Sequence, residues 1–509
     1  MSTASSPRYF EWLGLGVALL AFAWLLWANR LFFHDDAYIS LRYSRNLAEH
    51  GEIVWNLGER VEGYTNFLHV VLSAALIHLG LSAENAARGL NLCVALTVFP
   101  ATIFAARRLA PADAFARGLV LLAVGATPGL AIWVLGGLEA SVVAAWIAWG
   151  TFGLISTLQS GSPRAAAMTG GVLSLAVLTR MDSAVFIAGC GLAALLFAPG
   201  LLARRFGLAL LVAGLPAVVA LLHMAWRLAY YGLPLPLTFY AKTGVPIAWR
   251  FEFLSDLPIY VLYGVPLLFL AVIAAVAGAR ARGMAAALGL PLFLQLAYVI
   301  WSGGDHMAGG RVVVPLTVPA ALLLLTQPSR RALAGGAAAL SLAIGLLSPP
   351  LHRDPAAFVG TLVGEHISRW PAGQSISLAT AGATPFHATD NAYIDQLGLN
   401  TPAIARRDPV PFRTPAQIVP GHSKGDGAYI LTQEPDVIIF GPAEGTTLDQ
   451  PLFLSDVELA EMPLFRTCYE VRTAQLSYGP ETEALNPTIP NPITFTWYQR
   501  ICTKKMPGT

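Results

Sequence analysis

The feature that most constrains this chain is a succession of apolar blocks that runs from residue 12 to residue 348. Each block has about 15 to 24 residues, which is long enough or nearly so for a helix to cross the ~30 Å hydrocarbon core of a membrane. Only 12% of all residues are charged, against about a quarter in soluble domains. A soluble enzyme is therefore excluded for this part, and residues 1–348 are predicted to form an all-α polytopic membrane domain. The eleven predicted spans are 12–33, 86–106, 117–135, 139–158, 165–179, 183–199, 206–229, 257–279, 283–301, 312–327 and 332–348.

The first block and one shorter block decide the topology. Block 12–33 is longer than the apolar core of a signal peptide and no small-residue cleavage motif follows it, so we expect an uncleaved helix. Block 67–79 is too short for a standard span and contains His69 and His78. Whether it crosses the membrane fixes the side of every later loop.

The arginines between the spans indicate that block 67–79 does not cross. In that case five arginine groups all fall on the side of the N-terminus, and the positive-inside rule places that side in the cytoplasm. If the block does cross, every group moves outside. We therefore predict an interfacial or re-entrant helix at 67–79 on the outer face. The groups are Arg107, Arg108 and Arg117; Arg164; Arg204 and Arg205; Arg280 and Arg282; and Arg330 and Arg331.

The tail, residues 349–509, differs in composition from the apolar part. It has many Pro, Thr, Asp and Asn residues and lacks a spanning block. Short runs typical of strands, such as 375–379 and 436–440, alternate with turn signals. After eleven crossings from a cytoplasmic start, we predict a small extracytoplasmic α/β domain.

The cysteines and the net charge narrow the choice of function further. The four cysteines include no CxxC pair, which excludes a zinc ribbon, and the net charge of +2 gives no electrostatic reason to bind nucleic acid. Cys468 and Cys502 lie in the tail, where an oxidising compartment favours a disulfide between them. Cys93 and Cys190 lie in apolar blocks and are expected to be small buried residues.

Under this topology nearly all distinctive polar motifs follow outward-facing span ends. The inward connections hold mostly arginine, alanine, glycine and serine. Because chance would scatter acidic residues more evenly, the asymmetry predicts one polar site at the outer membrane surface. The motifs are His34-Asp35-Asp36-Ala37-Tyr38, Gly137-Leu138-Glu139, Thr179-Arg180-Met181-Asp182, residues 230–242 with Tyr240 and Lys242, and Gly303-Gly304-Asp305-His306 continuing to Arg311.

The pair Asp35-Asp36 directly follows the first span, at the depth where hydrocarbon meets water. One interpretation is that the aspartates cap the next helix, which is expected to end at Gly51. The other is that one carboxylate is a positioned base or charge stabiliser beside bound lipid. Both interpretations hold together if one aspartate caps and the other reacts.

Four basic side chains on the same face are candidates for binding phosphate. Arg180, Lys242 and Arg311 lie beside span ends, and arginine binds phosphate oxygens bidentately whereas lysine acts as a point charge. Snorkelling to lipid headgroups is the alternative for each. His306 is a further candidate for phosphate or a metal, although a lone histidine is more often a hydrogen-bonded structural residue.

The polar loop 55–66 is punctuated by glycines and flanked by aromatic residues. It is either an ordered surface turn with a Glu–Arg pair or a source of hydroxyl and amide contacts to a sugar. In the second case Glu62 and Tyr64 are candidate substrate contacts.

These motifs together resemble the terminal arabinofuranosyltransferase of mycobacterial cell walls and its relatives in the GT-C superfamily of membrane glycosyltransferases. The resemblance is strongest in the first outer loop and extends, in order and spacing, along most of the chain. It rests on residues 35–48, 54–56, 58–65, 137–139, 234–242, 303–305 with Arg311, and 393–395 with 398–399.

The resemblance implies a GT-C fold and a bacterial inner-membrane enzyme that moves a sugar, expected to be arabinofuranose, from a polyprenyl-phosphate donor to an envelope glycan or glycolipid on the outer face. An aspartate there can take the acceptor's hydroxyl proton while cations stabilise the departing lipid phosphate. We favour Asp36 for this role, with Asp35 as its partner or a cap. The expected substrate contacts are Tyr38, Glu62, Tyr64, Glu139, Asp182, Tyr240 and Asp305, and the expected phosphate contacts are Arg180, Lys242, Arg311 and His306.

Several alternatives stay open at this point. The acceptor is a glycan, a glycolipid or a protein such as a pilin, and the reaction either inverts or retains configuration. The sequence identifies no definite cofactor, and dependence on a divalent cation is left open. A transporter or flippase of lipid-linked sugars is the competing class, but such proteins usually place charged groups near the membrane midplane, whereas these spans are almost free of Asp, Glu and Lys.

Overall fold

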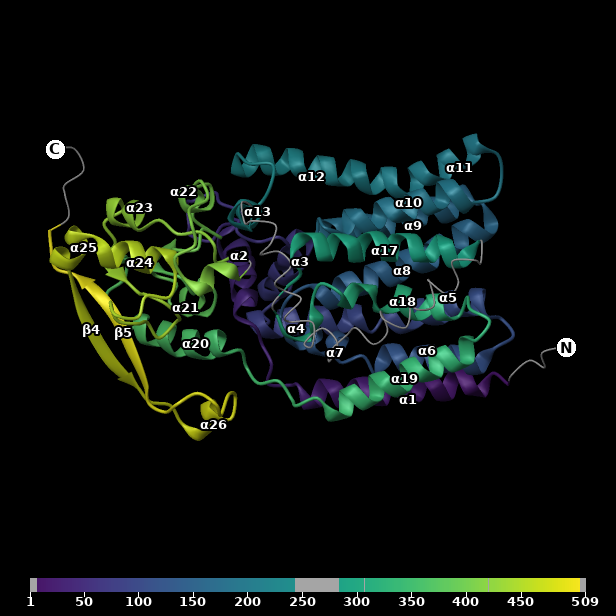
Figure 1. Cartoon of the computed structure of the whole chain (residues 1–509), viewed down its shortest axis with the longest axis horizontal. Coiled ribbons are helices and arrows are strands. Elements are labelled where there is room, and N and C mark those ends of the chain that lie inside the picture. Colours follow the sequence, from purple (N-terminus) through teal and green to yellow (C-terminus); the bar gives the residue numbers. More distant parts are fainter. Residues whose placement is uncertain (1–6, 243–282, 306, 420, 504–509) are drawn as a thin grey trace.

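The chain folds into an elongated bundle of helices with a mixed α/β domain at one end (Figure 1). The computed structural model describes residues 7–242, 283–305, 307–419 and 421–503. The predicted division into a helical apolar part and a small α/β tail agrees with this architecture.

Ten of the eleven predicted blocks coincide with helices, and the eighth, 257–279, lies outside the described residues. Within the described residues, six helices are long and apolar enough to span a membrane, or seven if the bent pair α6–α7 is one span. The count of eleven spans therefore stays a prediction. The bundle helices are α1 (Tyr9–Ala28), α4 (Ala83–Ala95), α5 (Val98–Leu109), α6 (Ala114–Gly125), α7 (Pro128–Leu135), α8 (Ala140–Ser160), α9 (Pro163–Thr179), α10 (Ser183–Phe197), α11 (Leu202–Ala209), α12 (Leu215–Tyr231), α17 (Met284–Ser302), α18 (Thr317–Leu324) and α19 (Arg330–Leu347).

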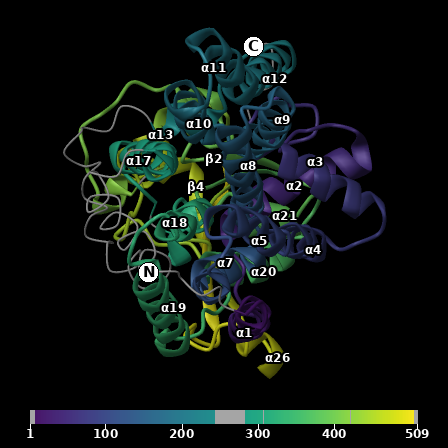
Figure 2. The same ribbon diagram turned by 90° about the vertical axis from the view of Figure 1, so that its right-hand side faces the viewer.

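Helix α8 lies in the middle of the bundle, with α1 and α19 on one side and α11 and α12 on the other (Figure 2). Small residues let the helices approach closely, as is usual inside membranes. A Cβ atom on Gly14 of α1 would lie 2.4 Å from the Cα atom of Gly118 in α6, and one on Gly125 would lie 2.5 Å from the carbonyl oxygen of Ala18. Alanine at these glycines would therefore push α1 and α6 apart.

The C-terminal end of α5, the helix α11 and the N-terminal end of α19, which carry arginine groups, lie at the end of the bundle that is remote from the tail (Figure 1). Glu11 accepts hydrogen bonds from Arg107 at 2.7 Å and Arg117 at 2.6 Å, and Asp113 pairs with Arg330 and Arg331 at 2.9 and 3.0 Å. Arg280 and Arg282 lie outside the described residues. The predicted separation of arginine loops from acidic motifs is thus confirmed for the described groups, and the identity of the two membrane sides stays a prediction.

Two short helices, α2 (Asp35–His50) and α3 (Phe67–His78), lie at the tail end of the bundle. Gly51 ends α2 in the left-handed conformation with φ of 74°, as predicted. Helix α3 has 12 residues and packs on α2, α4 and α9. At 1.5 Å per residue it is roughly 18 Å long, which is well short of a membrane span.

We expect a periplasm-active reporter fused after Gly80 to behave like one fused after Gly51, because α3, with 12 residues, is too short to cross. A reporter fused after Pro111 should report the cytoplasm. Opposite signals from the Gly51 and Gly80 fusions would overturn the eleven-span topology.

The tail forms a mixed sheet of five strands in the order β2-β1-β3-β5-β4, in which β2, β1 and β3 are parallel and β5 runs antiparallel to both neighbours. The predicted strands at 375–379 and 436–440 are confirmed by β1 and β3. The elements are α20 (Pro355–Ile367), β1 (Ser375–Leu378), α21 (Ala383–His387), β2 (Ala392–Asp395), α22 (Pro402–Ala405), α23 (Gly427–Thr432), β3 (Val437–Ile438), α24 (Leu454–Glu461), α25 (Pro463–Cys468), β4 (Tyr469–Leu476), α26 (Pro480–Glu483) and β5 (Ile493–Arg500).

The cysteine predictions are confirmed in two cases and wrong in one. Cys468 and Cys502 form a disulfide across the ends of β4 and β5, with their Cα atoms 4.9 Å apart. Cys190 is buried as expected. Cys93 is exposed rather than buried, because α4 turns it to the outer surface of the bundle instead of toward α8.

Candidate functional site

The tail is fixed to the first outer loop by hydrogen bonds between side chains and backbone. Asn56 bonds both to the carbonyl oxygen of Tyr393 at 2.9 Å and to its amide at 3.2 Å. The hydroxyl of Tyr43 donates to Asn400 at 2.9 Å. Arg42 donates to the carbonyl of Pro385, within α21. Much of the motif that carries the family resemblance therefore joins the two domains.

Asp35 belongs to this junction. Its carboxylate accepts a hydrogen bond of 2.8 Å from the amide of Ala383, and a Cβ on Gly382 would lie 2.3 Å from its backbone oxygen. Burial raises the pKa of Asp35 to about 8, although the bond from Ala383 acts in the opposite direction. Neither aspartate caps α2, because the ring of His34 accepts the bond from the amide of Asp36 at 3.2 Å.

We expect the attachment of the tail to weaken as pH rises from about 4 to about 8, that is, from the ordinary pKa of an aspartate to the pKa of Asp35 in the folded chain. A carboxyl group whose pKa is higher in the folded chain stabilises it most when protonated, so its contribution is lost as pH rises through about 8. Asp35→Asn keeps the accepting oxygen and removes the charge, and should therefore lose less thermal stability over this range than the wild type.

The measurement is the unfolding temperature of the purified chain at a series of pH values. The exposed Asp449→Asn is the matched control. Equal pH dependence in Asp35→Asn and the wild type would contradict the prediction.

Asp36 is turned toward a different set of groups. It is partly exposed, and its charge acts on the ammonium group of Lys242. Lys242 ends α13 (Leu237–Lys242), which also carries Tyr240 and packs on α22. The pKa of Lys242 is lowered, first because surrounding protein displaces water and second because Arg311 is near. Asp36 and Arg311 thus both lie within electrostatic reach of Lys242 at the tail end of the bundle.

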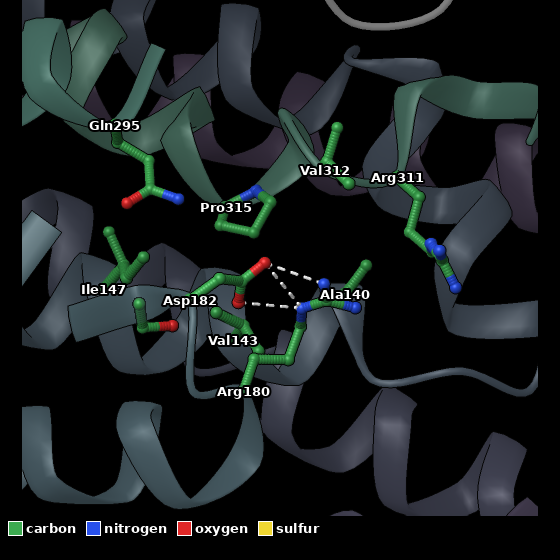
Figure 3. Close-up of a pocket in the computed structure, with 10 residues that line it drawn as sticks. Ala140, Val143, Ile147, Arg180, Asp182, Gln295, Arg311, Val312 and Pro315 are labelled. Carbon is green, nitrogen blue, oxygen red and sulfur yellow. Dashed lines mark hydrogen bonds and ion pairs between the residues drawn. The ribbon is translucent and has the colours of Figure 1, made fainter. Parts of the chain in front are cut away.

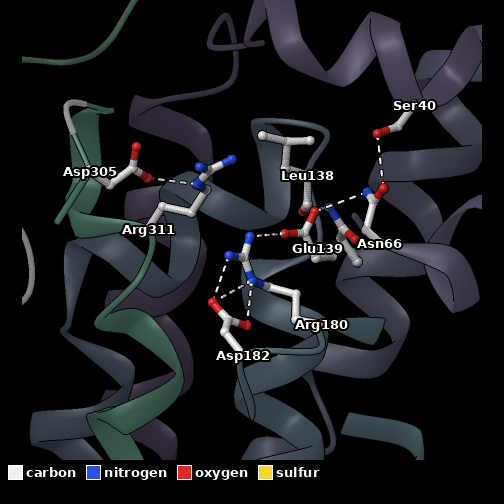
Figure 4. Close-up of polar contacts among 9 residues, drawn as sticks. Ser40, Asn66, Leu138, Glu139, Arg180, Asp182, Asp305 and Arg311 are labelled. Atoms are coloured by element: carbon white, nitrogen blue, oxygen red, sulfur yellow. Dashed lines mark hydrogen bonds and ion pairs between the residues drawn. The ribbon is translucent and has the colours of Figure 1, made fainter. Parts of the chain in front are cut away.

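A network of ion pairs lies beside these groups (Figure 4). The guanidinium of Arg180 bonds to Glu139 at 2.7 Å and forks onto Asp182, with the shortest distance 2.7 Å. Glu139 also accepts from Asn66 at 2.9 Å, and Asn66 accepts from Ser40 at 3.0 Å. This series of hydrogen bonds connects the ends of α8 and α9 to α2.

A second pair completes the network. Arg311 donates to Asp305 at 2.7 Å and lies over the ring of Trp133, 5.8 Å from its centroid. Burial acts to raise the pKa values of Glu139 and Asp182, but Arg180 and Arg311 outweigh it and lower both. The network therefore holds ionised carboxylates against both arginines.

A small hollow with about 20 Å³ of internal space, partly open to solvent, adjoins this network (Figure 3). Arg180, Asp182, Ser183, Gln295 and Arg311 supply its polar lining. Its remaining walls are apolar side chains of α8 and of residues 312–315.

Three of the predicted substrate contacts form hydrogen bonds or ion pairs with residues outside this network. The hydroxyl of Tyr38 bonds to Glu84 and accepts from Arg353 at 3.1 Å. Glu62 forms a buried ion pair of 2.9 Å with Arg227, and the hydroxyl of Tyr64 lies 3.1 Å from that of Tyr231. These contacts fasten the first outer loop to the linker before α20 and to α12.

His306 lies outside the described residues, so its proposed contact to phosphate or metal stays a prediction. Among the residues that the structure does describe, no group of three or more His, Cys, Asp or Glu side chains is placed to hold a metal ion. The question of a divalent cation therefore stays open.

Asn66 and Gln295 belong to this site but were not among the predicted site residues. Asn66 was contained in the polar loop but had no distinguishing signal of its own. Gln295 did have one, because a polar side chain inside an apolar span is costly and needs a partner.

Comparisons with known proteins bear on these geometries. The terminal β-(1→2)-arabinofuranosyltransferase of Corynebacterium glutamicum is 28% identical over 359 residues, covering 62% of this chain and 51% of that protein. The enzyme of the same name from Mycobacterium tuberculosis is 27% identical over 254 residues, covering 48% and 40%. The chain resembles these terminal arabinofuranosyltransferases. It spans about half the length of these curated relatives.

Two further matches concern the fold and the tail. The crystal structure of ArnT from Cupriavidus metallidurans bound to undecaprenyl phosphate aligns with a TM-score of 0.52 and 14% identity, covering 97% of this chain and 98% of that one. The chain therefore shares the membrane-protein fold of ArnT along almost its whole length, as the GT-C resemblance implied. Residues 355–488 match a family model described as a domain of unknown function, DUF8728.

Proposed function

We propose that the chain is a GT-C membrane glycosyltransferase that transfers a sugar, in our view arabinofuranose, from a polyprenyl-phosphate donor to an envelope glycan. The observation that carries the proposal is that Asp36 and Arg311 both lie within electrostatic reach of Lys242 at the tail end of the bundle. The carboxylate can accept a proton, and the two cations can bind a phosphate. The resemblance to the arabinofuranosyltransferases supports the choice of sugar.

In the proposed reaction the acceptor's hydroxyl gives its proton to the carboxylate of Asp36. Its oxygen forms a bond to the anomeric carbon while the bond from that carbon to the phosphate oxygen breaks. The lipid phosphate leaves with the electron pair, and Lys242 and Arg311 stabilise its charge. Arg180 holds Glu139 and Asp182 in place beside the reacting groups.

We further propose that the bundle crosses the bacterial inner membrane eleven times, with residues 349–509 and the site on the extracytoplasmic side. The positive-inside rule and the gathering of arginines at the remote end support this orientation. The disulfide in the tail also suits an oxidising compartment.

The test is transfer by the purified full chain from synthetic polyprenyl-phospho-arabinofuranose to an arabinose-containing glycan, followed by mass spectrometry of the product. Polyprenyl phosphates that carry other pentoses or hexoses serve as parallel donors. Transfer of arabinofuranose above all others supports the proposal. Turnover with a different sugar would revise the donor, and the absence of transfer from any of them would reject the function.

A further inference from the structure

The orientation of Gln295 is fixed by one hydrogen bond. Its Oε1 atom accepts 3.0 Å from the amide of Phe186, in the first turn of α10, where helix amides lack partners of their own. The backbone N–H of Phe186 is a donor, so the side-chain atom that faces it must be the oxygen. The Nε2 group of Gln295 therefore points the other way. Figure 3 shows this nitrogen turned toward the middle of the hollow. Gln295 is only 6% exposed, and its Nε2 has no partner among the residues that the structure describes.

The charges around the hollow do not suit a phosphate. Arg180 and Arg311 carry two positive charges, and Glu139, Asp182 and Asp305 carry three negative charges against them. The network is therefore negative by one. Of its members Arg180, Arg311 and Asp182 line the hollow, and because both arginines are already paired with carboxylates, a phosphate entering the hollow would meet the carboxylate of Asp182 without a free cation to balance it. Like charges at short distance in a poorly solvated site repel strongly.

A hydroxyl group fits where a phosphate does not. It can donate to the carboxylate of Asp182 and accept from the Nε2 group of Gln295 at the same time. The hollow has about 20 Å³ of internal space, which is room for a hydroxyl group but not for a whole sugar ring, and its apolar walls at Val143, Ile147 and Pro315 suit the C–H groups next to that hydroxyl. Gln295 lies seven residues before Ser302, the end of α17, so it lies roughly 10 Å below the tail end of the bundle.

We propose that this hollow is the subsite that binds one hydroxyl group of the donor's sugar, and that Gln295 is a specificity-determining residue in it. The inference rests on the proposed function. It assigns the sugar and the lipid phosphate of the donor to two separate binding sites. The phosphate then belongs beside Lys242, outside the hollow, and Arg180 organises carboxylates rather than binding phosphate directly.

The experiment measures binding by calorimetry to the purified full chain in detergent. The two probes are synthetic polyprenyl-phospho-arabinofuranose and the same polyprenyl phosphate without sugar. Gln295→Met removes the donor without adding charge, and should weaken binding of the sugar-bearing lipid about tenfold. Binding of the sugar-free lipid should stay within about twofold of the wild type.

Two further variants keep the result interpretable. Val143→Leu retains Gln295 and narrows the hollow by one methylene, so it should also weaken only the sugar-bearing lipid. Gln159→Met, at the remote end of the bundle, is the matched control and should bind both lipids normally. Thermal unfolding of each variant identifies any loss caused by misfolding.

Two results would overturn the inference. The first is unchanged binding of the sugar-bearing lipid in folded Gln295→Met and Val143→Leu. The second is an equal loss of affinity for both lipids, which would make the hollow a phosphate-binding site. Failure of the proposed function looks different, because the wild type itself would then show no preference for the sugar-bearing lipid and no transfer.

Discussion

Replacing Asp36 by asparagine is expected to lower the rate of sugar transfer about 10²–10⁴-fold while the chain still folds. Asparagine has nearly the same size, and the cap of α2 comes from His34, so the helix keeps its start. What is lost is the carboxylate that accepts the proton of the attacking hydroxyl. The measurement is the initial rate of transfer from polyprenyl-phospho-arabinofuranose, with monodispersity in detergent checked for each variant.

Asp35→Asn is the matched control for this prediction. Its side chain is buried against Ala383 and lies at the domain junction, so the variant should keep most of the transfer rate. Near-normal turnover by folded Asp36→Asn would reject the assignment. An inactive Asp35→Asn beside an active Asp36→Asn would pass the role to Asp35.

Glu62→Ala is expected to destabilise the fold by about 3–5 kcal/mol, the usual cost of leaving one charge of a buried pair alone. The side chains of Glu62 and Arg227 are each only 2% exposed. The backbone oxygen of Glu62 also accepts from the amide of Leu237 at 2.8 Å, at the start of α13. Loss of the pair should therefore lower the unfolding temperature sharply and loosen the helix that carries Lys242.

Arg227→Met should destabilise the fold less than Glu62→Ala, because a buried glutamate left without its partner can become neutral by taking up a proton, whereas a buried arginine cannot lose its charge. Burial raises the pKa of Glu62 to about 7 even with Arg227 present, so an abandoned Glu62 takes up a proton near neutral pH. An abandoned Arg227 stays charged. Equal losses in the two variants would contradict this reasoning. Normal stability of Glu62→Ala with a raised KM for the donor would instead restore Glu62 as a substrate contact.

The features that the sequence predicted well are those with a local signal. A span is a run of apolar residues, and the short strands β1 and β3 are runs bounded by turn residues, so each can be recognised without its neighbours. The disulfide followed from the compartment assigned to Cys468 and Cys502. The gathering of polar motifs at one end followed from the alternation of loops, which is also a property of the chain order.

The features that it missed depend on partners far apart in the chain. Nothing near Glu62 indicates that Arg227 will neutralise it, and nothing near Asn56 indicates the backbone of Tyr393. Such polar residues have the composition of a binding site whether they contact a substrate or the other domain. The geometry that separates the two roles exists only after folding.

The junction between the first outer loop and the tail has a consequence for biosynthesis. Asp35 and Ala383 are 348 positions apart, and Asn56 and Tyr393 are 337 apart. At synthesis rates of about 5–20 residues per second, the loop waits roughly 20 to 70 s for its partners. During that time polar groups that are later buried must stay hydrated or be shielded by other proteins. A chain released before residue 383 would keep them exposed, which gives cellular quality control a means to distinguish truncated from finished copies.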